Sequence, residues 1–236
     1  MKMQPFLKNK IHKPLPLGFP IVNENCTEFE VNNWVISEFV VEHLVPIINL
    51  HPFPITELHL MVSAVCRIRP VLILEWGTHI GKSARIFYET INKFNIPCKI
   101  HTVDLPDNVF HQEAPHEKIG MYINNIPEIS CHRGDGIETS IKIWNNCGTP
   151  RNIIFFLDGD HSYETVNREL KLIIDQAPAS PKGILIHDTF YQSEGSGYNI
   201  GPYKAIQDNW KTFENEGYKI YSSLLGLPGI TLIYKL

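Results

Sequence analysis

The fold is decided by the stretch Val71-Leu-Ile-Leu-Glu-Trp-Gly-Thr-His-Ile-Gly-Lys-Ser83. Its apolar run ends in the acidic residue Glu75, and two glycines follow at positions 77 and 81. A helical apolar pattern begins directly afterwards. This order predicts a buried strand, a tight turn and a helix N-terminus, which together form a cofactor-binding loop in an α/β sheet.

Outward from this stretch, strand and helix patterns alternate along the chain. We expect strands at 70–75, 98–104, 129–133, 152–158, 182–187, 218–224 and 230–235. We expect helices at 31–50, 56–67, 81–94, 116–124, 136–146, 162–177 and 201–215. This alternation is typical of an α/β fold with a Rossmann-like, doubly wound sheet of seven strands and helices on both faces.

The last two expected strands are connected differently from the others. Only a short turn around residues 226–229 separates them, and a parallel crossover needs a much longer connection. We therefore expect an antiparallel C-terminal hairpin. The predicted sheet is mostly parallel, with one antiparallel strand from this hairpin.

Composition excludes several classes of protein. The 236 residues are 43% hydrophobic and 19% charged, as in an ordinary soluble globular protein. The net charge of −4 disfavours nucleic-acid binding, and we expect no membrane span because no apolar run approaches the ~20 residues needed. The five scattered cysteines show no CxxC spacing, so we expect reduced thiols in a cytoplasmic protein.

The glycine stretch also resembles a phosphate-binding P-loop, but its spacing is wrong. A P-loop needs four residues between its first glycine and Gly-Lys-[Ser/Thr], whereas three follow Gly77 and the required glycine position holds Trp76. A shorter loop encloses less space for a phosphate. A P-loop-like nucleotide-binding enzyme is therefore kept only as an alternative, and the nicotinamide-type GxGxxG pattern is absent.

Acidic residues end three successive expected strands, at Glu75, Asp104 and Asp135. Each acid alone is as consistent with a helix cap or a solvated loop as with a ligand contact. Together they lie where open α/β sheets bind ligands. With the acid-x-Gly-x-x-x-Gly loop, they resemble class I S-adenosylmethionine-dependent methyltransferases. In that family the second acid clamps the ribose and the third faces the adenine.

Two later segments bring further acids and histidines to the same edge. Asp158-Gly-Asp-His-Ser-Tyr163 follows the fourth strand, and His187-Asp188 ends the fifth. Asp158, His187 and Asp188 are therefore predicted to converge on one divalent cation. His187 in a role other than ligand remains an alternative.

These segments resemble a methyltransferase subgroup that includes cephalosporin-hydroxylase-like proteins and metal-dependent macrolide-sugar O-methyltransferases. The resemblance covers about residues 55–236 and implies that His161 is the general base. His187 stands where the subgroup usually has Glu. Asp160 is expected as a helix cap or orienting group rather than as a ligand. For His161 the alternative is a surface histidine at a helix start.

The resemblance implies a division of the chain and a set of ligands. Residues 1–55 would form an N-terminal arm and a helix packing on the core, and residues 56–236 the catalytic domain. S-adenosylmethionine would be the cofactor, with a divalent metal that is Mg²⁺ first and Mn²⁺ or Fe²⁺ second. The cofactor-binding residues would be Glu75, Gly77, Thr78, Gly81, Ser83, Asp104, Asp135 and Asp158.

The implied reaction is methyl transfer to a hydroxyl of a small molecule of sugar or natural-product type. The cation lowers the pKa of that hydroxyl, and His161 removes its proton. A homo-oligomer is expected as in relatives. Two alternatives stay open, namely a metal-dependent hydroxylase on the same fold and a non-catalytic binding protein.

Two loops are expected to border the pocket. Residues 189–202 combine glycines and serines with Phe190, Tyr191 and Tyr198, which suits an acceptor wall or lid as well as an ordinary connection. Phe110, His111 and His116 lie in the long connection after the second strand.

Overall fold

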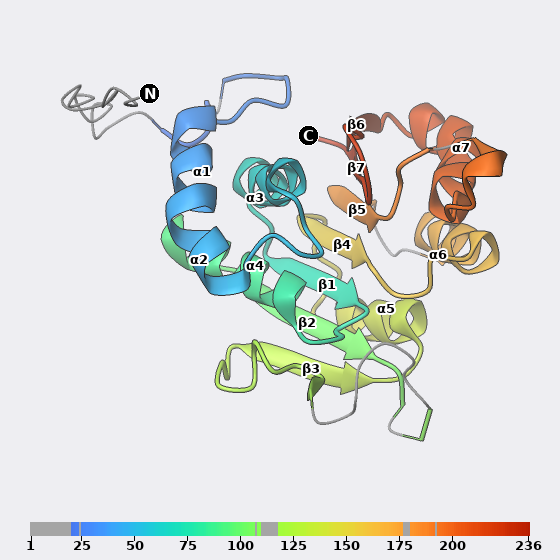
Figure 1. Cartoon of the computed structure of the whole chain (residues 1–236), viewed down its shortest axis with the longest axis horizontal. Helices are drawn as coiled ribbons and strands as arrows, with labels where there is room; N and C mark the ends of the chain where they lie inside the picture. Colours follow the sequence, from blue (N-terminus) through green and yellow to red (C-terminus); the bar gives the residue numbers. More distant parts are fainter. Residues whose placement is uncertain (1–19, 24, 107, 110–117, 177–179, 192) are drawn as a thin grey trace, which may run out of the picture.

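A computed structural model describes residues 20–23, 25–106, 108–109, 118–176, 180–191 and 193–236. Its centre is a seven-stranded sheet in the order β3-β2-β1-β4-β5-β7-β6 (Figure 1). The strands are β1 Leu72–Trp76, β2 Lys99–Asp104, β3 Ile129–Arg133, β4 Ile153–Leu157, β5 Gly183–His187, β6 Lys219–Ser223 and β7 Ile230–Tyr234. Strands β1 to β5 pair in parallel, and β7 runs antiparallel to both β5 and β6. The predicted fold class is confirmed, including its single antiparallel strand.

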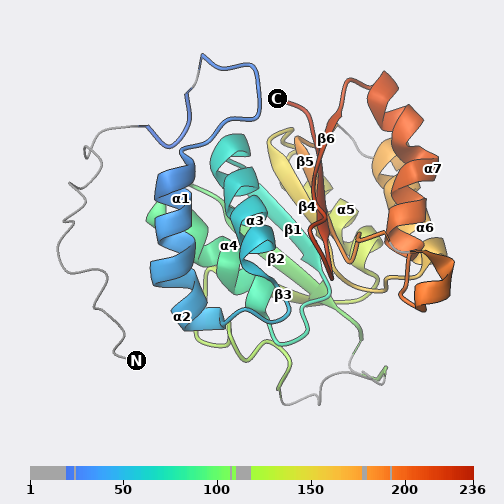
Figure 2. The ribbon, with the colours of Figure 1, turned by 45° about the horizontal axis from the view of Figure 1, so that its top comes forward.

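Helices cover both faces of the sheet. The helices are α1 Asn33–Phe39, α2 Val45–Ile48, α3 Ile55–Ile68, α4 Lys82–Lys93, α5 Gly136–Asn146, α6 Tyr163–Gln176 and α7 Gly201–Asn215. Figures 1 and 2 show α1 to α4 on one face and α5 to α7 on the other. The alternation of strand and helix is what places connections on both sides of a parallel sheet.

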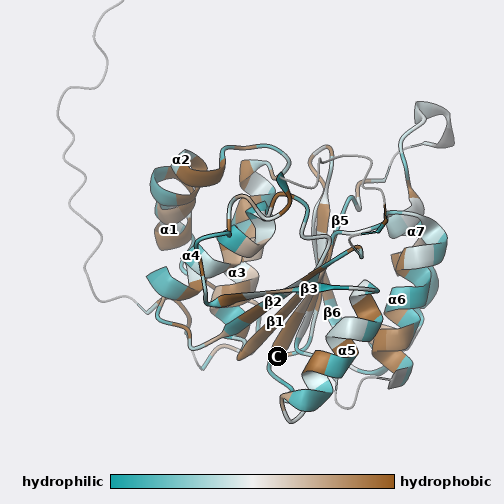
Figure 3. Ribbon diagram, turned by 90° about the horizontal axis from the view of Figure 1, so that it is seen from below, coloured by the Kyte–Doolittle hydropathy of each residue, from teal (hydrophilic) through white to brown (hydrophobic). Residues whose placement is uncertain are grey.

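The core consists of two apolar layers, one on each face of the sheet. Successive strand residues point to opposite faces. Accordingly Ile73 packs in the layer under α1 to α4, whereas Leu72 and Leu74 pack in the layer under α5 to α7. Figure 3 shows central strands that are mainly hydrophobic and helices with hydrophilic outer positions. Side chains at alternate positions therefore emerge on a defined face at the end of each strand.

The predicted helix at 31–50 is interrupted. A π-helical turn, Val40–Leu44, separates α1 from α2. Pro46 lies at the start of α2 and has no backbone N–H to donate to the preceding turn. A wider turn before the proline accommodates that missing bond.

The predicted helix at 116–124 is wrong for the part that the structure describes. Residues 118–125 form successive turns instead. Gly120 has a φ of 72°, which ends any helix there, and its N–H donates to the His79 carbonyl at 2.7 Å. The Tyr122 N–H donates to the Ile80 carbonyl at 3.0 Å. In an α-helix these N–H groups would bind carbonyls of the same segment. Here they bind the glycine loop instead and hold the segment against it.

The N-terminal helices pack on the same core as the rest of the chain. Ile36, Phe39 and Leu44 are buried in the layer that also contains α3 and α4. Residues 1–19 lie outside the described residues, so the division at residue 55 stays a prediction. Across the described ranges, none of the helices has the length and apolar character needed to cross a membrane.

Candidate active site

The glycine loop between β1 and α4 depends on close backbone contacts. Gly77 has a φ of 94°, and a Cβ there would lie 1.8 Å from the Asp158 carbonyl oxygen. Gly81 has a φ of 84°, and a Cβ there would approach Ile123 to 3.0 Å. Both positions favour glycine because of the positive φ alone. The loop is therefore pressed against the end of β4 on one side and the 118–125 turns on the other.

Glu75 is buried at the end of β1 beneath the start of α4. The residue has no exposed surface, and neither carboxylate oxygen has a hydrogen-bond partner among the described residues. Burial raises the pKa of Glu75 to about 8, and the nearby Ser83 and Thr102 hydroxyls, which lie outside good hydrogen-bond geometry, oppose this only in part. A buried polar group without a partner is costly, so this carboxyl group marks a place where a ligand could supply one.

Asp104 ends β2 and fastens the glycine loop. One carboxylate oxygen accepts the His79 N–H at 2.9 Å, and the other accepts the Leu105 N–H at 2.7 Å. Next to it, the Thr78 and Thr102 hydroxyls lie 2.6 Å apart in the buried interior. Asp104 and Thr78 therefore lie at the predicted edge.

Asp135 adopts the helix-capping role that the sequence left open. Its side chain accepts the Glu138 N–H at 3.0 Å at the start of α5 and forms an ion pair with Arg168. Ser83 is buried in the first turn of α4. The cofactor contacts predicted for Asp135 and Ser83 stay predictions.

Asp158, His187 and Asp188 converge where β4 and β5 end. The potential ligand atoms of the three side chains all lie within 4.8 Å of one another. The His187 Nδ1 is 2.9 Å from an Asp158 oxygen and 3.6 Å from an Asp188 oxygen. Burial lowers the pKa of the imidazole, but the surrounding carboxylates, led by Asp158, outweigh that effect and raise it to about 10. The residues predicted to share one cation are therefore neighbours.

Glu57 is the site residue that the sequence interpretation missed. It lies in the first turn of α3 and is 2% exposed, and one oxygen is 3.0 Å from the His187 Nε2. The other oxygen accepts the Gly229 N–H at 2.7 Å. Its partner is 130 positions away in the chain, so no local motif contains both. The available signal was a carboxylate on the apolar face of a helix, a placement that is rare without a partner.

His161 faces the same cluster from the start of α6. Its Nε2 lies 3.1 Å from an Asp188 oxygen and 3.9 Å from an Asp158 oxygen. Its side chain is 30% exposed, which leaves it within reach of solvent and substrate. His161 thus lies at a helix start, as its alternative supposes, and also beside the predicted cation ligands, so its role as the base stays a prediction.

Asp160 braces the start of α6, where the Ser162 hydroxyl accepts the Thr165 N–H. It accepts hydrogen bonds from the Ser162 N–H, the Ser162 hydroxyl and the Thr165 hydroxyl. Burial alone would raise the pKa of Asp160, but these bonds, with Thr165 first, lower it. The expectation of a capping or orienting group agrees with these contacts.

The loop at 189–202 touches the cluster at two points. The Tyr198 hydroxyl donates to Asp188 at 2.7 Å, and the Asn199 amide donates to the His161 carbonyl at 2.6 Å. The loop therefore holds a predicted ligand and the predicted base, although its role as acceptor wall or lid stays a prediction. Phe110, His111 and His116 lie outside the described residues.

Lys82 does not adopt the position of a P-loop lysine. Its ammonium donates to the Asn49 side chain at 3.0 Å and to the His51 carbonyl, and it lies over the Tyr122 ring. The side chain is buried between the glycine loop and the segment before α3. The Lys82 ammonium is thus bound to protein oxygens rather than directed at the space that a phosphate would occupy, which gives no support to phosphate binding.

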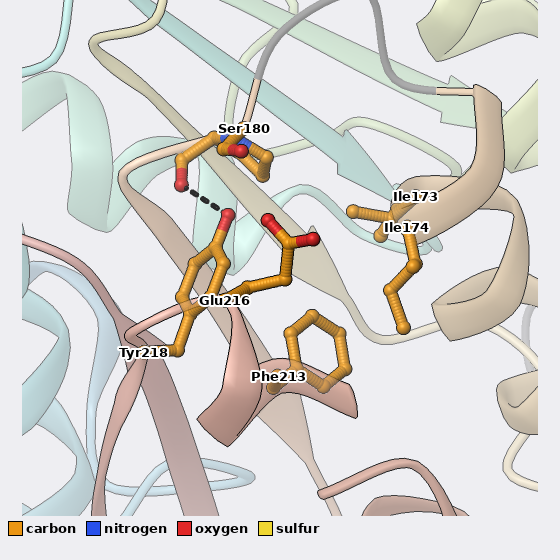
Figure 4. Close-up of a pocket in the computed structure, with 7 residues that line it drawn as sticks. Ile173, Ile174, Ser180, Phe213, Glu216 and Tyr218 are labelled. Atoms are coloured by element: carbon orange, nitrogen blue, oxygen red, sulfur yellow. Dashed lines mark hydrogen bonds between the residues drawn. The ribbon is translucent and has the colours of Figure 1, made fainter. Parts of the chain in front are cut away.

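Two cavities lie away from these residues. Figure 4 shows one of about 40 Å³, lined by Ile173, Ile174, Ser180, Pro181, Phe213, Glu216 and Tyr218. That volume suits one or two water molecules rather than a cofactor. A groove of about 480 Å³ near the amino ends of β4 and β5 includes Arg67, Lys182 and Lys235. Neither cavity contains a predicted site residue. The candidate site is therefore identified by its acidic and histidine side chains, at the carboxyl ends of β4 and β5.

Comparison with known sequences gives one family and one group of curated relatives. Residues 45–225 match the family model described as Rhamnosyl O-methyltransferase/CmcI, which is more than half of the chain. Rhamnosyl O-methyltransferases of Mycobacterium bovis (strain BCG / Pasteur 1173P2) and Mycobacterium tuberculosis (strain H37Rv) are 27% identical over 151 residues. This match covers 63% of the chain and 59% of the relatives' length.

Comparison with solved structures gives the same fold. The O-methyltransferase TomG from Streptomyces achromogenes, in complex with SAM, has a TM-score of 0.53 at 13% identity and covers 85% of this chain and 87% of its own. The apo structure of CalS11, a TDP-rhamnose 3'-O-methyltransferase, has a TM-score of 0.51 at 16% identity and covers 86% and 92%. At these identities the likeness shows the fold alone.

Proposed function

The chain belongs to the Rhamnosyl O-methyltransferase/CmcI family, and we propose that it transfers a methyl group from S-adenosylmethionine to a hydroxyl of a sugar-type small molecule with the help of a divalent cation. The observation that carries the proposal is the convergence of Asp158, His187, Asp188 and His161 at one edge of the sheet. The glycine loop and Glu75 lie at the same edge. Donor binding and acceptor chemistry would thus meet at the ends of β1, β4 and β5.

The residues present fit a divalent cation. Asp158 and Asp188 offer carboxylate oxygens, and His187 offers a ring nitrogen beside them. Divalent ions in proteins take such mixed oxygen and nitrogen donor sets. When bound, the cation would lower the pKa of a substrate hydroxyl.

The glycine-loop residues fit a cationic donor such as S-adenosylmethionine. Glu75 has a buried carboxyl group without a partner among the described residues, and Asp104 adds a second buried acid nearby. S-adenosylmethionine supplies a methyl group on a positively charged sulfonium, together with an ammonium group. A bound positive charge would favour the ionised form of Glu75 and offset the cost of burying it beside Asp104.

His161 would act on the acceptor, because its Nε2 faces the two aspartates that hold the cation. An imidazole at that place removes the hydroxyl proton as the methyl group is transferred. Asp188 and the Asn199 bond to the His161 backbone fix the ring in place. Tyr198 in turn holds Asp188, so the 189–202 loop supports the base as well as the acceptor side.

The proposed acceptor follows from the family and from the donor set. The curated relatives are rhamnosyl O-methyltransferases, and CalS11, which shares the fold, is a TDP-rhamnose 3'-O-methyltransferase. Two neighbouring hydroxyls on a sugar can approach a cation held by carboxylates. A sugar hydroxyl is also too weakly acidic to lose its proton without a cation and a base.

The test is methyl transfer from labelled S-adenosylmethionine to a panel of rhamnose-containing glycosides and nucleotide sugars. We expect labelled product that disappears after chelation and returns when a divalent ion is added. Product formation unaffected by chelation would contradict the cation's role. An Asp158→Asn variant should lose transfer, whereas Asp175→Asn, an exposed acid on α6, should not.

A further inference from the structure

His187 is held on both sides of its ring. The Nε2 is 3.0 Å from Glu57, and the Nδ1 faces Asp158 at 2.9 Å and Asp188 at 3.6 Å. The residue is 4% exposed, and the Phe53 ring packs against it with ring centres 4.8 Å apart. The imidazole therefore has one orientation.

Glu57 fixes which nitrogen of His187 carries the proton. One Glu57 oxygen already accepts the Gly229 N–H, and the other faces Nε2. An ionised carboxylate only accepts hydrogen bonds, so Nε2 is protonated. Nδ1 faces carboxylate oxygens of Asp158 and Asp188, so without a cation it carries a proton as well. A cation bound among these groups would replace that proton and take the Nδ1 lone pair, while Glu57 keeps the proton on Nε2. A carboxylate behind a histidine in this way orients metal-binding imidazoles and raises their basicity.

Resting on the proposed function, we propose that the site selects a transition-metal ion that accepts imidazole nitrogen, of the Fe²⁺, Co²⁺ or Zn²⁺ class, over Mg²⁺. Glu57 is the positioning residue for this selection. Imidazole suits these ions, whereas Mg²⁺ favours carboxylate and water oxygens. A buried, oriented Nδ1 cannot be exchanged for water without moving the ring away from Glu57.

The test uses the full chain, stripped of metal, with Co²⁺ as the probe. Bound Co²⁺ is followed by its visible absorption, which is independent of methyl transfer. We expect one Co²⁺ to bind and at least a tenfold excess of Mg²⁺ to leave it in place. His187→Glu should reverse the preference, because it replaces the nitrogen by oxygen.

The role of Glu57 is tested separately. Glu57→Gln should weaken Co²⁺ binding by about 10- to 100-fold and shift the absorption band. Glu38→Gln changes an exposed glutamate on α1, so it should alter neither. Circular dichroism shows whether each variant is folded. An unchanged Co²⁺ band in folded Glu57→Gln would overturn the positioning role.

The remaining outcomes separate this inference from the proposed function. Displacement of Co²⁺ by a tenfold excess of Mg²⁺ would overturn the selectivity and leave methyl transfer standing. No divalent binding, with intact S-adenosylhomocysteine binding, would mean that a protonated His187 bridges the carboxylates itself. That result would overturn both this inference and the cation in the proposed function. Loss of S-adenosylhomocysteine binding as well would refute the proposed function as a whole.

Discussion

At the residue scale, burial raises the pKa of Glu75 to about 8, well above its ordinary value of 4.5. The folded state therefore holds a proton that the unfolded state has lost between these two values. By linkage, the stabilising contribution is complete below about pH 4.5 and disappears as pH rises through 8. Glu169, whose pKa burial also raises to about 8, contributes in the same direction.

We predict that Glu75→Gln flattens this pH dependence in the ligand-free protein. The free energy of unfolding of the unaltered chain should fall between pH 5 and pH 8, and the variant should lose about 2–4 kcal/mol less over that range. Urea unfolding at several pH values measures the difference. The remaining slope in the variant belongs to Glu169 and, above pH 6.5, also to His187, whose pKa is raised to about 10. Parallel curves for both proteins would show that Glu75 does not retain its proton on folding.

His161 gives a second prediction at the residue scale. His161→Ala should lower kcat for methyl transfer by about 10²- to 10⁴-fold, because the proton acceptor is removed. The affinity for S-adenosylhomocysteine should stay within a factor of about three, since the base serves the acceptor. His43→Ala is the matched control, because His43 lies on the π-helical turn, where it contacts Glu89 of α4 away from the cluster. Equal turnover in both variants would remove His161 from the mechanism.

At the scale of elements, the glycine loop is shaped by contact with the end of β4. We predict that Gly77→Ala destabilises the protein far more than Gly148→Ala does. Both glycines have positive φ, at 94° and 79°, but a Cβ at 148 meets nothing within 4 Å. Gly148→Ala should therefore cost about 1 kcal/mol of backbone strain, and Gly77→Ala several kcal/mol. Urea titrations of the two variants compare these costs, and equal values would mean that the Asp158 contact has little weight.

The strands could be predicted from sequence because each combines an apolar run with turn residues at its ends. The site followed partly from strand alternation. Glu75, Asp158 and His187 lie two positions beyond Ile73, Phe156 and Leu185, which all pack in one apolar layer. Side chains two positions apart in a strand point to the same face of the sheet, so the two acids and the histidine emerge on the same face as that layer.

The features that could not be predicted depend on contacts between segments that are far apart in the sequence. The 118–125 turns form because their N–H groups bind the His79 and Ile80 carbonyls, which no helical pattern records. Glu57 reaches His187 only after α3 has packed on the sheet. The sequence is equally consistent with capping and with ligand binding at Asp135, because its Arg168 contact joins residues that are distant in the chain.

At the scale of the whole molecule, the sheet brings donor-binding and acceptor-activating residues to one edge. The glycine loop follows β1, and the cluster of Asp158, His187 and Asp188 follows the neighbouring strands β4 and β5. This adjacency is what makes methyl transfer between them geometrically reasonable. The central claim is therefore that S-adenosylmethionine binds at this edge.

Calorimetric titration of the folded, metal-supplemented protein with S-adenosylhomocysteine tests this claim most directly, because it needs no knowledge of the acceptor. We predict saturable binding at a single site, weakened at least tenfold in an Asp104→Asn variant that stays folded. Absence of binding heat over a range of temperatures, from protein shown to be folded by circular dichroism, would contradict the account.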